Sequence, residues 1–226
     1  MYRRRRRIGG AAFVSLITVL AAVLAACSPA ASGVPPTPGP SGTSTTGPAP
    51  TSTLSADARL AAALGPLEPG YTFETTLTVG GQVAAHVTGR RLGTSSELTI
   101  VSGGATVTYR IIPPAAWLQD EAGAWAVATD PGSSADPVAP LLKPVTVKSI
   151  PGSAGVDQLE ATYPASALGL KGTDPITVKI GVASDGSVTV HFETTVGSQA
   201  GVSETVFHAA PTQDPIVPPS PLPSAG

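Results

Sequence analysis

The chain has 226 residues, among them 24 prolines, 13 basic and 15 acidic side chains, and one cysteine. A single cysteine excludes an internal disulfide and any metal site built on several thiolates. Residues 1–26 hold five arginines and no acid, so the remainder has 8 basic and 15 acidic side chains and a formal net charge of −7. That charge excludes the basic surface with which proteins bind nucleic acid or anionic membranes.

The N-terminus has the pattern of a secretory signal peptide. Five arginines, Arg3 to Arg7, precede an uncharged, mostly apolar stretch, and small residues lie before Cys27. The tetrapeptide Leu24-Ala25-Ala26-Cys27 resembles the lipobox of bacterial lipoproteins, in which the signal is cut before a cysteine whose thiol is diacylated. We therefore expect residues 1–26 to be removed and lipidated Cys27 to anchor the protein at the extracytoplasmic face of the cell membrane.

Two other interpretations of this segment stay open. The uncharged residues 8–26 are just long enough to span a bilayer as an uncleaved helix. Alternatively, cleavage after Leu24-Ala25-Ala26 would release a soluble protein with a free thiol. Lipidation is favoured because chance rarely places a lone cysteine where an apolar segment meets a polar linker.

Two proline-rich segments flank the part that we expect to fold. Residues 27–56 comprise Cys27 and a disordered linker rich in proline, serine and threonine. Residues 211–226 contain six prolines and are expected to form a disordered tail. Residues 57–210 between them have the size of one domain.

A short helix is expected from Ser55 to Leu64. Ser55 can cap its start, while Gly65 can close it and Pro66 prevents its continuation. Leu60 and Leu64 share one face of this helix, so that face can lie across a sheet.

After Gly70 the hydrophobic period changes to two, which is typical of strands with one apolar and one polar face. Gly80-Gly81, Gly103-Gly104 and Asp185-Gly186 mark turns between them. Ten or eleven strands are expected, around residues 71–79, 83–88, 98–100, 106–111, 115–119, 124–128, 145–150, 156–163, 176–182, 188–196 and 202–208.

These segments predict a mainly β protein of the α+β class. Consecutive half-apolar strands favour an antiparallel meander with one dry and one wet face. Only residues 55–64, 137–142 and 164–168 are helical candidates, so the dry face must be covered by the curvature of the sheet, by short helices or by a ligand. We therefore expect a single curved antiparallel sheet with a few short helices on its concave side.

Catalytic and metal-binding patterns are missing from the sequence. His86, His191 and His208 have no zinc-type spacing, and His86 and His191 are expected on the polar face of their strands. Glu193 shares that face with His191. No Gly-x-Ser-x-Gly motif occurs, so we expect no enzyme, no metal and no cofactor.

The order of these features resembles the mycobacterial LppX/LprAFG lipoproteins, which share a LolA-like half-barrel. Besides the lipobox, the resemblance covers residues 57–210. It rests on a helix leading into strand 71–79, the segment Ala115-Ala116-Trp117-Leu118, Trp125 after a glycine turn, Asp136-Pro137 before an apolar run, and the hairpin at Asp185-Gly186.

The resemblance implies a carrier whose curved sheet encloses an apolar groove for an acylated lipid. It implies a lining of Val79, Val87, Ile100, Val107, Tyr109, Ile111, Ile180, Val190 and Phe192. Two alternatives stay open: these side chains can simply pack as a core, and the protein can be a structural or protein-binding lipoprotein that carries nothing. The sequence identifies neither the lipid nor a protein partner.

Overall fold

One large antiparallel sheet makes up most of the structure, a computed structural model that describes residues 54–128, 136–153 and 155–220. Cys27, the expected signal peptide and nearly all of the expected linker lie outside these residues. The strands are β1 (Gly70–Val79), β2 (Gln82–Leu92), β3 (Ser95–Ser102), β4 (Ala105–Ile112), β5 (Ala115–Gln119), β6 (Trp125–Val127), β7 (Thr146–Ile150), β8 (Val156–Tyr163), β9 (Ile176–Ala183), β10 (Val188–Val196) and β11 (Gln199–Ala209).

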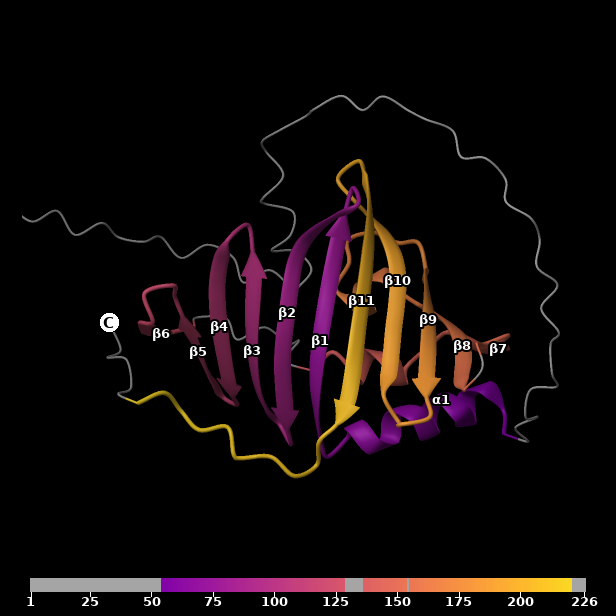
Figure 1. Ribbon diagram of the computed structural model, residues 1–226, viewed down its shortest axis with the longest axis horizontal. Coiled ribbons are helices and arrows are strands. Elements are labelled where there is room, and N and C mark those ends of the chain that lie inside the picture. The colour runs from indigo at the N-terminus through magenta and orange to yellow at the C-terminus, as the bar shows by residue number, and fades with distance from the viewer. Residues whose placement is uncertain (1–53, 129–135, 154, 221–226) are drawn as a thin grey trace, which may run out of the picture.

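The strand order is β6-β5-β4-β3-β2-β1-β11-β10-β9-β8-β7 (Figure 1). The chain therefore starts at the centre of the sheet, winds outward to β6, crosses to β7 at the opposite edge and winds back to the centre. There β11 pairs with β1 along its whole length, from Tyr71 opposite Ala209 to Val79 opposite Gly201. The two ends of the folded segment thus meet at the middle of the sheet.

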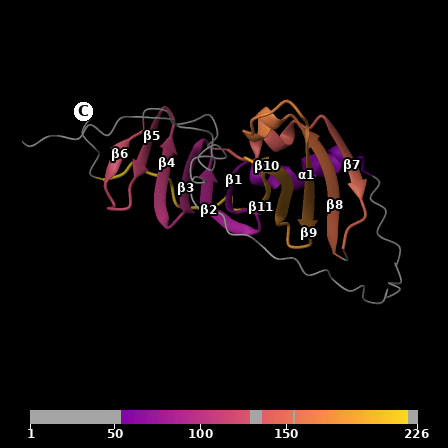
Figure 2. The same ribbon diagram turned by 90° about the horizontal axis from the view of Figure 1, so that it is seen from above.

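The sheet is curved and does not close (Figure 2), so the predicted fold class, a mainly β half-barrel, is confirmed. Every predicted strand has a counterpart among the described residues, but β2 extends beyond its expected end to Leu92. Gly89-Arg90-Arg91 interrupts the apolar alternation there. The strand continues because Arg90 makes an ion pair across the ladder with Glu97 on β3, at 3.0 Å.

Positive backbone φ angles explain the tightest hairpins. Gly80 and Gly81 between β1 and β2 have φ angles of 57° and 79°. Gly103 and Gly104 between β3 and β4 have 59° and 84°. Two consecutive residues with positive φ form the two-residue turn whose twist matches that of paired strands, and glycine adopts it without steric cost.

The helical segments are short. Helix α1 (Ala56–Leu64) is capped by the Ser55 hydroxyl, which accepts a hydrogen bond from the Ala58 N–H, so the predicted helix is confirmed. Gly65 does not close it as expected: its φ of −53° is helical, and the chain continues into a 3₁₀ turn, η2 (Gly65–Leu67). The candidates at 137–142 and 164–168 form only single 3₁₀ turns, η3 (Ala139–Leu142) and η4 (Ala165–Leu168).

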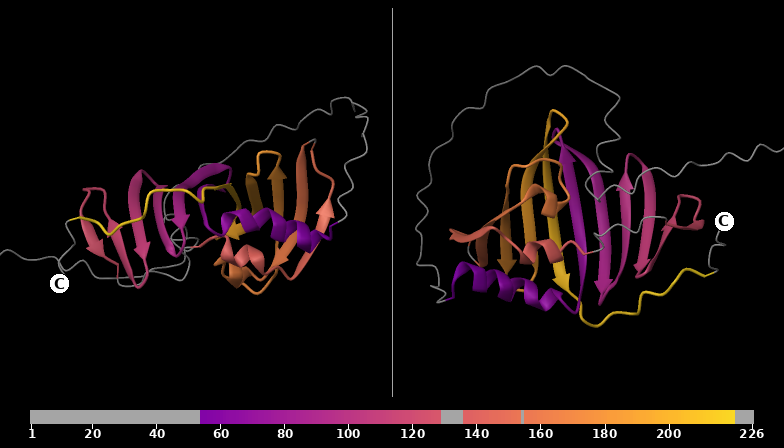
Figure 3. Two further views of the ribbon diagram at one scale, coloured as in Figure 1. Left: turned by 90° about the horizontal axis from the view of Figure 1, so that it is seen from below. Right: turned by 180° about the vertical axis from the view of Figure 1, so that it is seen from behind.

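These helices cover the concave face over one half of the sheet, seen from behind in Figure 3 (right). Leu60 and Leu64 of α1, Leu67 of η2 and Leu141 of η3 are all buried in the main core. From the sheet, that core includes Tyr71, Phe73, Leu159, Tyr163, Val178, Ile180, Val188, Val190, Phe192 and Phe207. The helical cover therefore lies mainly over β7 to β11 and β1.

The segment after β11 differs from the expected disordered tail. Residues 211–220 run along the sheet, where Arg90 donates to the Asp214 carbonyl (2.8 Å) and Arg110 to the Val217 carbonyl (3.0 Å). Between them Ile216 is only 7% exposed. We call residues 211–220 the C-terminal strap. Proline content indicated disorder, but the Asp214 and Val217 carbonyls accept hydrogen bonds from arginine side chains, which hold the segment without a strand.

Candidate functional site

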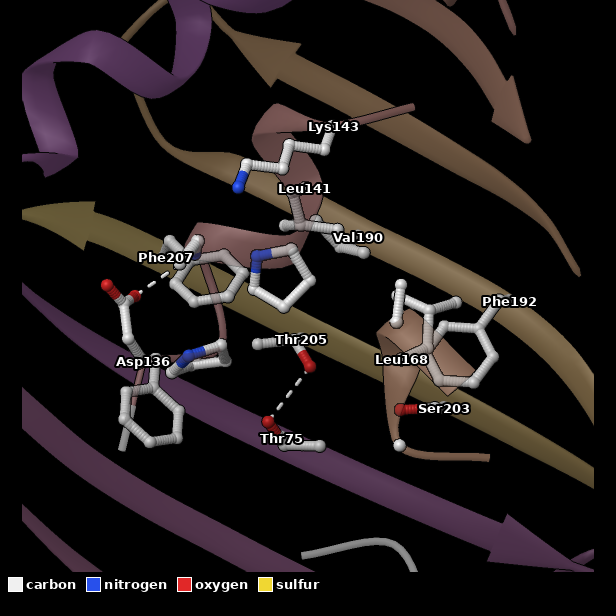
Figure 4. A pocket seen from close by; sticks show the side chains of 16 residues that line it. Thr75, Asp136, Leu141, Lys143, Leu168, Val190, Phe192, Ser203, Thr205 and Phe207 are labelled. Carbon is white, nitrogen blue, oxygen red and sulfur yellow. Dashed lines mark hydrogen bonds between the residues drawn. The ribbon is translucent and has the colours of Figure 1, made fainter. Parts of the chain in front are cut away.

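A cavity of about 430 Å³ lies between the concave face of the sheet and the turns η3 and η4 (Figure 4). The segments 136–143 and 167–169 form its roof. Its floor comes from the three central strands: Phe73 and Thr75 of β1, Val190 and Phe192 of β10, and Ser203, Thr205 and Phe207 of β11. The lining is mostly carbon, as in sites that bind apolar ligands.

Small side chains at the centre of the floor explain why the interior is not filled. Thr75 lies opposite Thr205 in the ladder. Ser203 lies two residues before Thr205, on the same face of β11. The Thr75 and Thr205 hydroxyls hydrogen-bond to each other at 2.9 Å (Figure 4). These two threonine hydroxyls therefore satisfy each other and need no water.

Phenylalanine rings close one end of the cavity. The Phe73 and Phe207 ring centroids lie 6.1 Å apart. Phe73 fits there because it lies over Gly89 of the neighbouring strand: a Cβ at Gly89 would come within 2.5 Å of the ring. Gly89 therefore helps to set the position of one cavity wall.

The start of η3 is held by a partly buried polar cluster. The Asp136 carboxylate accepts hydrogen bonds from the Tyr71 hydroxyl at 2.8 Å and from the backbone N–H groups of Val138 and Ala139. Its second oxygen pairs with Arg91 at 3.1 Å. Burial, with the Asp136 charge and hydrogen bond next, raises the pKa of Tyr71 far above its ordinary value. Tyr71 therefore stays neutral and donates a hydrogen bond to this carboxylate.

A second buried tyrosine holds the other end of η3. The Tyr163 hydroxyl donates to the Leu141 carbonyl at 2.9 Å, and burial raises the pKa of Tyr163 to about 12. Tyr71 and Tyr163 have no exposed surface. The roof is thus fixed at both ends by phenol groups that come from the sheet.

Lys143 follows η3 directly. Among the described residues that line the cavity, it is the one with a cationic side chain. It is exposed, and within the described part of the chain no carboxylate forms an ion pair with it. Asp136, the acidic residue of the lining, already has Arg91 as its partner. Lys143 is consequently the uncompensated charge at this site.

Two of the nine predicted lining residues, Val190 and Phe192, line the cavity. Val87, Ile111 and Ile180 are buried in the main core outside it. Ile100 and Tyr109 pack against that core, and burial raises the pKa of Tyr109.

The remaining two predicted lining residues also lie outside the cavity. Val107 is half-buried on β4. Val79 belongs to a separate small cluster with Ala85. Lipid contact at the seven residues outside the cavity stays a prediction, and their observed role is packing within the sheet.

Sequence reasoning missed most of the cavity. The roof contributes Asp136, Leu141, Lys143 and Leu168, and the floor contributes Phe73, Thr75, Ser203, Thr205 and Phe207. The sequence feature that could have indicated the cavity was the small hydroxyl residues on the inward faces of β1 and β11. On β11 that signal was hidden, because both faces mix apolar and polar residues.

His86 and His191 lie on the convex face, as expected for polar positions. His86 lies 3.5 Å from Glu74, and His191 lies 4.0 Å from Glu193 and 3.8 Å from Glu204. Among residues 54–128, 136–153 and 155–220, no group of three or more histidine, cysteine or acidic side chains could hold a metal ion.

Comparison with protein-family models gave no match, and a search of curated proteins gave none either. Within the described residues, no helix has the length and apolar character needed to cross a membrane.

Proposed function

We propose that this chain is a cell-envelope lipoprotein, anchored through acylated Cys27 at the extracytoplasmic face, whose half-barrel binds or transfers an acylated lipid. The cavity of about 430 Å³ between the concave face and η3 and η4 carries this proposal. A curved sheet with short helices over an apolar hollow is also what membership of the LppX/LprAFG group would require. The membrane and an acylated lipid would then be its partners.

Binding would be driven by the removal of hydrocarbon from water. Each methylene group that leaves water contributes about 0.8 kcal/mol, and the shape of the cavity sets which chains fit. Phe192, Leu168 and Val190 supply the apolar contact surface. The cavity favours this function over a lipoprotein that carries nothing, because such a protein has no need of an unfilled interior.

Uptake of a fluorescent fatty acid by the full-length protein tests the proposal. Within the part of the chain that the structure describes, the Ser203 hydroxyl has no hydrogen bond that a substitution would remove, and Ser203→Phe places a ring in the cavity. Val202→Phe adds a ring at the preceding residue, which faces the convex side and serves as the matched control. We expect saturable uptake by the wild-type protein and by Val202→Phe, and its loss in Ser203→Phe. Equal uptake by both variants would contradict the proposed site.

A further inference from the structure

We infer that the cavity accommodates one acyl chain of roughly 16 carbons with an anionic headgroup beside Lys143. This inference rests on the proposed function and names its ligand class: a single-chain anionic amphiphile, either a free fatty acid or a lysophospholipid. It follows from the volume of the cavity, from the polarity of its two ends and from the unpaired charge.

The volume sets the number of chains. At the packing density of protein interiors, a methylene group occupies roughly 27 Å³. A cavity of about 430 Å³ is therefore filled by one chain of about 16 carbons. A lipid with two such chains would leave one of them in water, at a cost that grows with every methylene group.

The two ends of the cavity differ in polarity. Under η4 the walls are Leu168 and Phe192, with the small residues Ala167 and Gly169. At η3 the Phe207 ring belongs to the floor, and the charged residues Asp136 and Lys143 belong to the roof; Figure 4 shows both charged residues apart from Leu168 and Phe192. An amphiphile would place the end of its chain under η4 and its headgroup at η3.

The charges at η3 select the sign of the headgroup. Asp136 is matched by Arg91 at 3.1 Å and by the Tyr71 hydroxyl at 2.8 Å, so its charge is already satisfied inside the protein. Lys143 has no such partner within the described residues and lies at the solvent side of the cavity. Arg91, Asp136 and Lys143 together carry one net positive charge. A carboxylate or phosphate headgroup would neutralise it.

A competition assay tests chain number and length. The full-length protein, held in nonionic detergent and loaded with a fluorescent fatty acid, is titrated with saturated fatty acids of 10 to 20 carbons, with a protein-free micelle blank. We expect the affinity, calculated from the free aqueous concentration of each acid given by the micelle blank, to rise about fourfold per methylene group and to level off near 16 carbons. A two-chain phosphatidylglycerol is expected to compete at least tenfold more weakly than palmitate. A rise that continues to 20 carbons, or equal competition by the two-chain lipid, would overturn the inference.

The headgroup is tested with palmitate, lysophosphatidylglycerol and the neutral 1-monopalmitoylglycerol. Competition by palmitate alone would identify a fatty acid, and competition by the lysophospholipid alone would identify a phosphate headgroup; either result supports the inference. Lys143→Ala is expected to weaken binding of the anionic competitor about two- to fivefold and to leave monopalmitoylglycerol unchanged. Lys179→Ala removes an equal charge from the exposed convex face of β9 and is expected to change neither.

The outcomes separate this inference from the function on which it rests. Saturable binding that is indifferent to headgroup charge, to Lys143→Ala and to chain number would overturn the single-chain anionic ligand while the lipid-binding function stands. Saturable binding of no lipid would overturn both.

Discussion

Two buried phenol groups fix the roof of the cavity at the scale of single residues. Tyr71 donates to Asp136 before η3, and Tyr163 donates to the Leu141 carbonyl within it. A turn of four residues has too few internal hydrogen bonds to hold its own position. These two contacts from the sheet therefore determine where the roof lies.

Removing either hydroxyl is expected to destabilise the protein. Tyr71→Phe and Tyr163→Phe keep the buried rings but leave a buried acceptor with one donor fewer. Each should lower the free energy of unfolding by about 1–3 kcal/mol, measured by urea denaturation. Both should also weaken uptake of the fluorescent fatty acid. Unchanged stability in both variants would show that η3 is held by other contacts.

The lining of the cavity was predicted only in part from the sequence, because several of its residues are inward-facing serines and threonines. Val190 and Phe192 were expected in the lining because the resemblance to the LppX/LprAFG lipoproteins implies a groove lined by apolar residues of the dry face, and both line the cavity. Thr75 and Thr205 also face inward, but a threonine in a strand is more often assigned to the wet face. Alternation with Phe73 and Phe207 puts both threonines on the inward face, but the pairing of β1 with β11 that brings them together is not revealed by local sequence.

At the scale of elements, two arginines on the convex face link strands β2, β3 and β4 to the C-terminal strap. Arg90 of β2 and Arg110 of β4 both pair with Glu97 of β3, at 3.0 Å and 2.6 Å. Both also donate to backbone carbonyls of the C-terminal strap. The guanidinium of Arg110 also lies 5.0 Å from the centre of the Trp125 ring. One cluster thus fastens the strap to the sheet.

Deletion of Pro211–Gly226 tests the role of the strap. The deletion exposes the surface that buries Ile216, so we expect the free energy of unfolding to fall by roughly 1.5–3 kcal/mol. The two tryptophans of the chain, Trp117 and Trp125, lie beside Arg110, so their fluorescence should shift to the red. Deletion of residues 221–226 alone keeps every strap contact described above and is the control. An unchanged spectrum and stability after the longer deletion would show that the strap contributes nothing.

The same cluster predicts a dependence of stability on acid. Burial alone would raise the pKa of Glu97, but its hydrogen bonds and ion pairs with Arg110 and Arg90 lower it overall. A lowered pKa in the folded state means that this carboxylate stabilises the fold above its unfolded pKa of 4.5 and loses that effect as the pH falls through the folded value. Glu97→Gln should therefore be less stable than wild type at pH 7, by about 1–3 kcal/mol, and the difference should shrink below pH 4.

Urea denaturation at a series of pH values measures this difference. Glu193→Gln removes a carboxylate that is 78% exposed on the same face and should follow the wild-type curve. A Glu97→Gln difference that stays constant from pH 7 to pH 3 would contradict an ionic role.

Element prediction succeeded where the period-two pattern was continuous and failed where other interactions took over. β9 and β10 were predicted because apolar residues alternate on both sides of Asp185-Gly186. The last residues of β2 were missed because an ion pair with β3, and not apolar packing, extends the ladder. The strap was taken as disordered because its contacts lie far away in the sequence, 124 residues from Arg90 to Asp214.

At the scale of the whole fold, topology brings the cavity to the middle of the sheet. Because β1 pairs with β11, residues from both ends of the fold, such as Phe73 and Phe207, form one floor. A single curved sheet was predictable from alternating strands and few helices. The strand order was not predictable, since alternation marks the faces of a strand but not its neighbours.

Cys27→Ser tests the proposed membrane anchor. Durable attachment needs two or more acyl chains, and all of them depend on this thiol and the cleavage next to it. We expect the wild-type protein to fractionate with membranes and to incorporate labelled palmitate, and the variant to lose the label and move to the aqueous fraction. A variant that stays in the membrane would support an uncleaved helix, and a wild-type protein already in the aqueous fraction would support soluble secretion.

The most direct test of lipid carriage is to identify what the protein holds in its own membrane. The full-length protein is purified from its native envelope beside Ser203→Phe, extracted with organic solvent and measured by mass spectrometry, with the acyl groups on Cys27 counted separately on the intact chain. Our account predicts close to one acylated molecule per wild-type chain and almost none for Ser203→Phe. No lipid above background in the wild-type extract, or equal amounts in both extracts, would contradict it.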